Sequence, residues 1–301
     1  DRLEALVDSI AVPWRLAAVG VGGGVPFPLP SPQVLVQSYL IDRLGWTHPT
    51  RANHCVSLSQ LTVKLATQLQ LRPILQAREA KHMVFLSQAC LGLPARLQAQ
   101  PLELLRVLRR LWRLPWDNQR KEFFWRFTVD GLPTAARMHM FGEPCAVCHS
   151  PAPGRRHHYW ECPVAVAIVT ELQRGLAGFG GEPLRCDHVW LARPPSPQLH
   201  KGLWLVVCQA ALMGMDKGRR LMVAATLNRN DQHRGLQSLP WPAQLQVVCR
   251  VAAATFWDML ADYVGLGLTP VTWLAEVHSQ HPFLGVHTAA DGRRSLVLRR
   301  V

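Results

Sequence analysis

Apolar residues recur at three- and four-residue steps along most of this chain, a spacing that places side chains on one face of an α-helix. One long pattern of this kind covers residues 243–266, where two apolar faces indicate a largely buried helix. A second long apolar segment covers 203–227. A third, 164–176, follows Pro163, and proline suits the first turn of a helix. No segment alternates with period two, so the pattern predicts a mainly α-helical fold.

Helical spacing also marks residues 55–114. Near its end Leu102, Leu105, Leu108 and Trp112 recur as one apolar series, and the proline of a Leu-Pro-Trp sequence then ends the helix. Basic residues fill the gaps of this series: Arg106, Arg109, Arg110 and Arg113. We therefore expect an amphipathic helix with a strongly basic side.

The next segment, residues 120–127, places Phe123, Phe124 and Phe127 on one helical face. Such a face is typical of a buried core helix, and we favour that interpretation over an aromatic platform for stacking bases. A Gly-Leu-Pro-Thr sequence at 131–134 ends this helix, and its threonine can cap a short helix that follows through position 140.

A metal-site spacing follows: Cys145-x2-Cys148-x8-His157-x4-Cys162. Two thiolates separated by two residues can reach one ion, and the second pair supplies the other two corners of a tetrahedron. A closed shell of sulfur and nitrogen suits a structural zinc ion, which holds a fold and leaves no position for a catalytic water. We therefore predict Zn²⁺ as the cofactor and no catalytic residue.

Two neighbouring histidines leave one ligand open, since only the fold decides which imidazole points inward. His158 lies one residue nearer to Cys162, and His149 directly follows Cys148. We prefer His157 because its four-residue separation from the last cysteine is the usual one in zinc knuckles.

The remaining cysteines show no disulfide-like spacing, which predicts reduced thiols and an intracellular protein of the nucleus or cytoplasm. Four further residues could in principle hold another zinc ion, but their wide and irregular gaps argue against it: Cys186, His188, His200 and Cys208.

The net charge of the chain indicates the kind of partner that it binds. The 301 residues include 33 Lys and Arg against 20 Asp and Glu, a net charge of +13, which favours a polyanion such as RNA or DNA. No apolar run reaches the roughly 18 residues of a membrane-spanning helix, so we expect no membrane partner. The start, residues 1–4, has neither an initiator Met nor a signal peptide, so we expect a piece of a longer protein.

Two loops rich in proline, at 20–30 and 193–197, separate the segments; three consecutive glycines in the first resemble a phosphate loop only superficially. The predicted organisation is an N-terminal segment with a Gly/Pro linker (1–54), a helical region (55–100), the zinc-binding domain (101–180), a C-terminal helical region (198–285) and a basic tail (286–301).

Five sequence segments between residues 111 and 167 resemble, in their order, the zinc-binding domain that follows the polymerase in reverse transcriptases of plant and algal non-LTR retrotransposons. They are Trp112-Arg113-Leu114-Pro115, Lys121-Glu122-Phe123-Phe124-Trp125-Arg126, Gly131-Leu132-Pro133-Thr134, Cys145-x2-Cys148 and His157-x4-Cys162-Pro163-Val164-Ala165. The match covers about a fifth of the chain. The resemblance implies Cys145, Cys148, His157 and Cys162 as zinc ligands and a parent polyprotein that copies RNA into DNA.

The chain departs from that family where the chemistry would lie. A polymerase of this class needs a Tyr/Phe-x-Asp-Asp hairpin for its metal ions, and the sequence contains no Asp-Asp pair. The expected function is therefore that of an accessory region, which binds retroelement RNA or DNA beside the polymerase portion of the same element. The alternative is a protein-interaction module in which zinc only stabilises a helical domain.

The expected nucleic-acid surface centres on Arg155 and Arg156, which directly precede the ligand His157. Tyr159 and Trp160 could stack on an unpaired base or pack beneath the metal; for Trp160 we favour packing. Further basic residues extend this surface: Arg106, Arg109, Arg110, Arg113, Arg120, Lys121 and Arg126.

Overall fold

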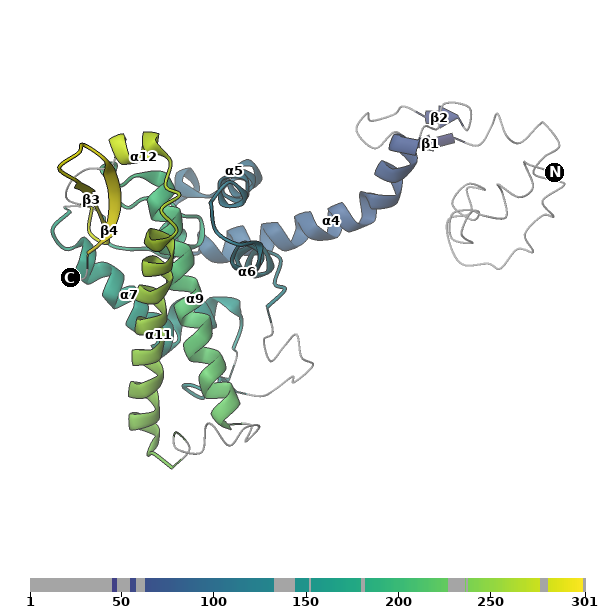
Figure 1. The fold of residues 1–301 in the computed structure, drawn as a ribbon. Helices are drawn as coiled ribbons and strands as arrows, with labels where there is room; N and C mark the ends of the chain where they lie inside the picture. The colour runs from purple at the N-terminus through teal and green to yellow at the C-terminus, as the bar shows by residue number, and fades with distance from the viewer. Residues whose placement is uncertain are drawn as a thin grey trace, which may run out of the picture. The chain divides into compact units, whose positions relative to one another are not determined.

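The computed structural model divides the chain into two compact units, residues 1–79 and 80–301 (Figure 1). The residues that it describes are 45–47, 55–57, 63–132, 144–151, 153–179, 182–226, 236, 238–276 and 281–299. The predicted connector at 20–30 and the short helix expected before residue 140 lie outside these ranges. The helices dominate, which confirms the predicted mainly α-helical class.

In the first unit, β1 (Gly45–Thr47) pairs antiparallel with β2 (Cys55–Ser57). The helix α4 (Val63–Ala89) begins in this unit and ends in the second.

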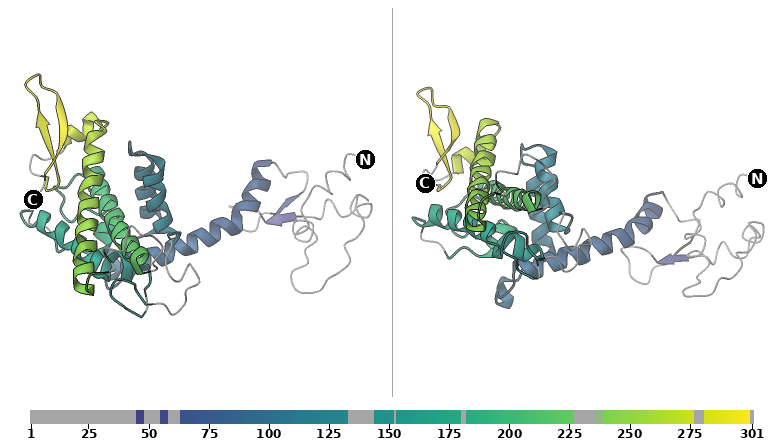
Figure 2. Two further views of the ribbon diagram at one scale, coloured as in Figure 1. Left: turned by 60° about the horizontal axis from the view of Figure 1, so that its bottom comes forward. Right: turned by 90° about the horizontal axis from the view of Figure 1, so that it is seen from below.

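Three helices form the centre of the second unit: α7 (Pro163–Leu176), α9 (Lys201–Thr226) and α11 (Trp241–Gly265). α9 and α11 lie side by side, and α7 packs against both (Figure 1, Figure 2). All three were predicted from apolar spacing, and each ends within two residues of its predicted end. The prediction that the last of them is largely buried is wrong, because α11 buries only one face, which carries Val248, Ala252, Phe256, Leu260 and Tyr263. α9 is buried on nearly every side because helices cover it all round, as its continuous apolar sequence requires.

Glycines let these helices approach closely. A Cβ atom at Gly214 would lie 2.6 Å from the carbonyl oxygen of Ala252 in α11, and one at Gly218 would lie 2.7 Å from Cγ1 of Val164 in α7. Either side chain would force the backbones apart, so the sequence of α9 fixes the distance to both neighbours.

The helix α6 (Asn118–Thr128) carries the predicted aromatic face inward. Phe124 and Phe127 are fully buried and Phe123 nearly so, which confirms the core interpretation. The side chain of Asp117 accepts a hydrogen bond from the backbone N–H of Arg120 at 2.9 Å and caps the start of this helix.

The preceding helix, α5 (Pro101–Trp112), faces the core with a different stripe from the one that its leucine spacing suggested. Its buried residues are Leu104, Val107, Leu108 and Leu111. Of the predicted series only Leu108 is buried; Leu102, Leu105 and Trp112 are exposed by 63, 37 and 46%. The helix has apolar residues on two sides, and packing covers one of them.

Shorter elements complete the second unit: η2 (Ala95–Leu97), α8 (Cys186–Trp190), α12 (Val271–Glu276), β3 (Leu284–Thr288) and β4 (Arg294–Leu298). β3 and β4 form an antiparallel hairpin, with Val286 opposite Leu296. The segment predicted as a basic tail is therefore mostly a hairpin. Its turn is closed by a hydrogen bond from the N–H of Gly292 (φ +79°) to the carbonyl of Ala289.

The regions predicted separately as 101–180 and 198–285 pack together, because α7 contacts both α9 and α11. None of the helices described here is both long enough and apolar enough to cross a bilayer.

Candidate metal centre

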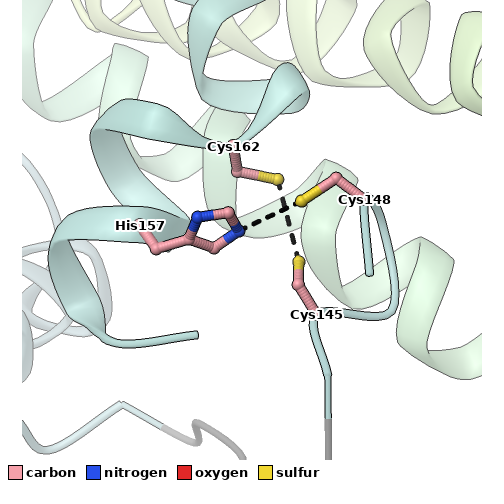
Figure 3. A group of neighbouring side chains, drawn as sticks. All are labelled: Cys145, Cys148, His157 and Cys162. Atoms are coloured by element: carbon pink, nitrogen blue, oxygen red, sulfur yellow. Dashed lines mark hydrogen bonds between the residues drawn. The ribbon is translucent and has the colours of Figure 1, made fainter. Parts of the chain in front are cut away.

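The four predicted ligands converge in the second unit (Figure 3). One sulfur or nitrogen atom from each of Cys145, Cys148, His157 and Cys162 lies within 4.8 Å of every other. The Sγ atoms of Cys145 and Cys162 are 4.0 Å apart, and Sγ of Cys148 lies 3.2 Å from Nε2 of His157.

These separations fit one tetrahedral ion. Zinc–sulfur bonds of about 2.3 Å place two sulfurs of a tetrahedron about 3.8 Å apart, and a sulfur and a nitrogen slightly closer. Two of the four ligand residues are buried and two are half-buried. The cluster can therefore bind a metal ion with a closed shell of three sulfurs and one nitrogen.

A tight turn brings the first two ligands together. The N–H of His149 donates to the carbonyl of Cys145 at 2.7 Å, and the N–H of Cys145 donates to the carbonyl of Ser150 at 2.9 Å. His149 adopts a left-handed backbone conformation, with φ of 58°, that reverses the chain. The sequence left His149 open as an alternative ligand. Its backbone forms the turn, and its ring is not among the four ligands.

The second two ligands flank a single π-helical turn, η3 (His157–Glu161). The N–H of Cys162 donates to the carbonyl of His157 at 2.7 Å, a five-residue step that brings both side chains to the same side. Cys162 is also the residue before the first turn of α7, where Pro163 begins the helix. The positive end of the α7 dipole lies there and favours a thiolate.

The thiols influence one another strongly. The pKa of Cys145 is lowered, first because the Cys162 thiol can donate a hydrogen bond to its thiolate and also because of nearby His158. The pKa of Cys162 is raised for the reciprocal reason, and burial raises the pKa of Cys148. Three thiolates this close need a cation, and a bound divalent ion supplies that charge.

His158, the alternative ligand, is not among the four residues whose ligand atoms gather. Its side chain is 95% buried, since only 5% of the residue is exposed, and it belongs to the surroundings of Cys145. Because η3 turns by one residue between the two histidines, only His157 directs Nε2 at Cys148. The choice of His157 agrees with this geometry.

Two side chains that sequence reasoning did not single out hold the metal loop to the helices. Nε1 of Trp241, at the start of α11, donates to the carbonyl of Val147 at 2.9 Å. Asp216 in α9 accepts a hydrogen bond from Oη of Tyr159 at 2.7 Å and pairs with Arg219 at 3.0 Å. Both contacts join segments far apart in sequence, so no local pattern could have revealed them.

The Tyr159 contact corrects one expectation. This side chain is 1% exposed and cannot stack on a base, because its ring packs against Phe127 with centroids 4.9 Å apart. Trp160 is half-buried and packs against the core, as favoured.

Arg155 and Lys121 also differ from the predicted nucleic-acid surface, because both side chains point inward. Arg155 is 5% exposed; its guanidinium donates to the carbonyls of Phe127 and Thr128 at 2.8 and 3.2 Å. Lys121 is 7% exposed, and its Nζ donates to the carbonyl of Trp112 at 3.4 Å. Each cation lies at the carbonyl end of a helix, where it offsets the helix dipole.

Three other predicted arginines are engaged by carboxylates. Arg120 pairs with Asp117 and Asp262, Arg126 pairs with Glu122, and Arg156 pairs with Glu161. These pairs reduce the charge that each arginine offers to a phosphate.

The α5 arginines remain. Arg106, Arg109 and Arg113 are exposed and form no ion pair within the ranges described, and Arg110 is half-buried. Among the residues described, the predicted surface thus keeps one group of unpaired cations, which lies on α5 and at its C-cap Arg113.

No second metal cluster occurs among the residues placed by the structure. His188 is buried and its carbonyl accepts hydrogen bonds from Trp204 and Cys208, so the second zinc site considered from the sequence is not assembled.

No family model, curated protein or solved structure matches this chain. The resemblance to retrotransposon zinc-binding domains therefore stays a prediction.

Proposed function

We propose that this chain is a zinc-stabilised, nucleic-acid-binding accessory region of a retrotransposon reverse transcriptase, without the polymerase active site. Its partners in this proposal are retroelement RNA or DNA and the polymerase portion of the same element. The proposal draws on the sequence resemblance, the metal cluster and the distribution of arginines.

The donor set supports zinc. Three cysteines and one histidine offer borderline-soft ligands in a closed tetrahedral arrangement, which zinc prefers over magnesium or calcium. Cys145, Cys148, His157 and Cys162 would hold the ion, which would offset two of the three thiolate charges and link the loop at 145–148 to the start of α7. Because metal binding and folding occur together at such sites, the free energy of metal binding stabilises the fold.

The observation that carries the nucleic-acid part is the outer face of α5. Arg106, Arg109 and Arg113 project from one rigid helix with no carboxylate partner among the residues described. The nearest acid on that helix, Glu103, is held by Arg193 through two hydrogen bonds of 2.6 Å. Unpaired cations on a chain of net charge +13 attract phosphates and give salt-dependent binding.

Metal analysis tests the first part. Purified full-length chain should contain one zinc ion, and Cys148→Ser should lose it and lower the melting temperature. Cys249→Ser is the matched control, because Cys249 is half-buried outside the cluster. A Cys148→Ser protein that keeps both its zinc and its melting temperature would contradict a structural metal site.

Salt titration tests the second part. We would measure binding of the full chain to a labelled RNA and compare Arg109→Gln/Arg113→Gln with Arg293→Gln/Arg294→Gln, which removes the same charge from the β3–β4 hairpin. Losing two phosphate contacts should reduce the slope of log K against log salt by about 1.4 on a single strand. An equal change in both double variants would show that only net charge matters, and would contradict a site on α5.

The alternative function, a protein-interaction module, is favoured by one observation: Leu102, Leu105 and Trp112 are exposed on the same helix. Size-exclusion chromatography separates the two functions. Concentration-dependent self-association with no shift on adding RNA would support the alternative.

A further inference from the structure

The outer face of α5 combines aromatic, aliphatic and cationic side chains. Trp112 lies seven residues, or two turns, after Leu105, with Arg109 between them on the same side. Arg106 and Arg113 are likewise two turns apart and lie beside this row. The indole of Trp112 is therefore an exposed aromatic surface bordered by guanidinium groups.

The backbone that carries this indole is held in place. The carbonyl of Trp112 accepts a hydrogen bond from Nζ of buried Lys121. The neighbours Leu111 and Leu114 are 0 and 3% exposed, so the backbone on both sides of Trp112 is anchored in the core. Trp112 itself is 46% exposed. A tryptophan fixed in this way presents its aromatic face without a large loss of conformational entropy on binding.

The spacing of the arginines matches a nucleic-acid strand. Seven residues of α-helix rise about 10.5 Å from Arg106 to Arg113. With about 3.4 Å per nucleotide in a stacked strand, that length covers roughly three nucleotide steps. Arg109 lies near the middle of this row, so each of the three guanidinium groups can meet a different phosphate within such a stretch.

We propose that Trp112 stacks on an unpaired base while Arg106, Arg109 and Arg113 contact the flanking phosphates, so that α5 binds single-stranded RNA or DNA. This inference rests on the proposed function and narrows it to one ligand class. Bases inside a duplex have both faces covered by their neighbours, and an indole on a helix surface reaches only a base that has left the stack.

An apolar partner helix fits this face less well. Leu108, which would join Leu105 to Trp112 in one row, is only 8% exposed, and Arg109 lies beside that gap, so the exposed apolar side chains do not form one continuous stripe. A docked apolar helix would bury the Arg109 guanidinium without a partner, and burying an unpaired charge is costly. Phosphates instead satisfy the cation and leave the indole free to stack.

The test compares strand states on the intact, zinc-loaded chain. Fluorescence anisotropy would measure Kd for a 12-nucleotide single-stranded RNA, the same DNA sequence, and the corresponding duplexes. Trp112→Ala should raise Kd for the single strands by about 5-fold or more, because stacking contributes about 1–3 kcal/mol per base. Kd for the duplexes should stay within about 2-fold, since no stacked base contacts the indole there.

Trp112→Phe and Leu102→Ala complete the set. Phenylalanine keeps an aromatic face, so Trp112→Phe should retain most of the single-strand affinity, whereas Leu102→Ala on the same face should change neither Kd. Zinc content and melting temperature of each variant verify that it is folded. If Trp112→Ala loses more affinity for single-stranded RNA than for single-stranded DNA, or the reverse, the strand with the larger loss is the one that the site prefers. Either result supports the proposal.

Three results would overturn this inference. The first is an unchanged Kd for single strands in folded Trp112→Ala, and the second is an equal loss of affinity for single strand and duplex in that variant. The third is a loss of affinity in Leu102→Ala as large as in Trp112→Ala, with no recovery in Trp112→Phe, which would indicate apolar protein docking. The arginine double variant separates this failure from that of the proposed function. If Arg109→Gln/Arg113→Gln weakens binding and Trp112→Ala does not, only the stacking role is wrong.

Discussion

Replacing Arg155 by methionine should destabilise the fold and leave nucleic-acid binding of the folded protein unchanged. The change removes the guanidinium and keeps most of the aliphatic side chain. Arg155 joins three segments just before the metal ligand His157. Its Nε donates to Oε1 of Gln88 in α4 at 2.9 Å, and Nη1 donates to the last carbonyls of α6.

The magnitude follows from those contacts. Two carbonyls at the end of α6 lose a charged donor in a buried place, and a hydrogen bond to a charged group contributes about 1.5–3 kcal/mol. Gln88 is half-buried and can bond to water instead, so it adds little. The substitution also removes the free-energy cost of burying the cation, which offsets part of this loss of stability. We expect the free energy of unfolding to fall by about 3 kcal/mol, a large share of the roughly 5–15 kcal/mol of a typical protein.

Urea denaturation of the full chain with excess zinc measures this change. Arg109→Met is the matched control; its side chain is exposed and unpaired among the described residues, so the same substitution there should change stability by less than about 0.5 kcal/mol. A folded Arg155→Met protein that loses under 1 kcal/mol, or that loses RNA affinity while Arg109→Met keeps it, would refute the structural role argued for Arg155.

Three further predictions concern helix packing, a buried histidine and the metal loop. Gly214→Ala should lower the free energy of unfolding by about 1–3 kcal/mol, because the added methyl group would lie 2.6 Å from the carbonyl oxygen of Ala252 in α11. Gly178→Ala, where the added methyl group meets open space, should not lower it. Urea denaturation measures both variants. Burial lowers the pKa of His281 to about 3, well below its unfolded value of about 6.5. The free energy of unfolding should therefore fall as the pH drops from about 6.5 toward 3, by up to about 1.4 kcal/mol per pH unit for this group. The variant His281→Asn should remove that part of the slope in urea titrations across this range, and an unchanged slope would count against the assignment. Finally, Trp241→Phe loses the hydrogen bond to the Val147 carbonyl and should release zinc to a competing chelator faster than the native chain; equal release would show that this bond does not hold the metal loop.

The sequence alone predicted the metal ligands well, because their geometry is mostly local. Cys145 and Cys148 lie in one turn, and His157 and Cys162 flank another, so each pair is positioned by a few backbone hydrogen bonds. The long helices were predictable for a related reason. Apolar residues recur at three- and four-residue steps along each of them, and in α11 the buried residues keep that spacing: Val248, Ala252, Phe256, Leu260 and Tyr263. The hairpin of β3 and β4 was missed because its strands have only five residues each and burial does not alternate along β3, where Leu284 and Gly285 are buried and His287 and Thr288 are exposed.

The chain by itself therefore determined that four ligands gather, that its long segments are helical and that its surface is basic. It did not determine which arginines reach that surface. α5 carries apolar residues on two sides, and whether Leu104 or Leu105 turned inward depended on the neighbours that pack against it. Arg155 and Arg109 look alike in sequence, but one meets the carbonyl end of α6 and the other meets solvent. Charge and periodicity are properties of a segment, whereas burial is a property of the segments that pack on it, and only the tertiary structure brings those together.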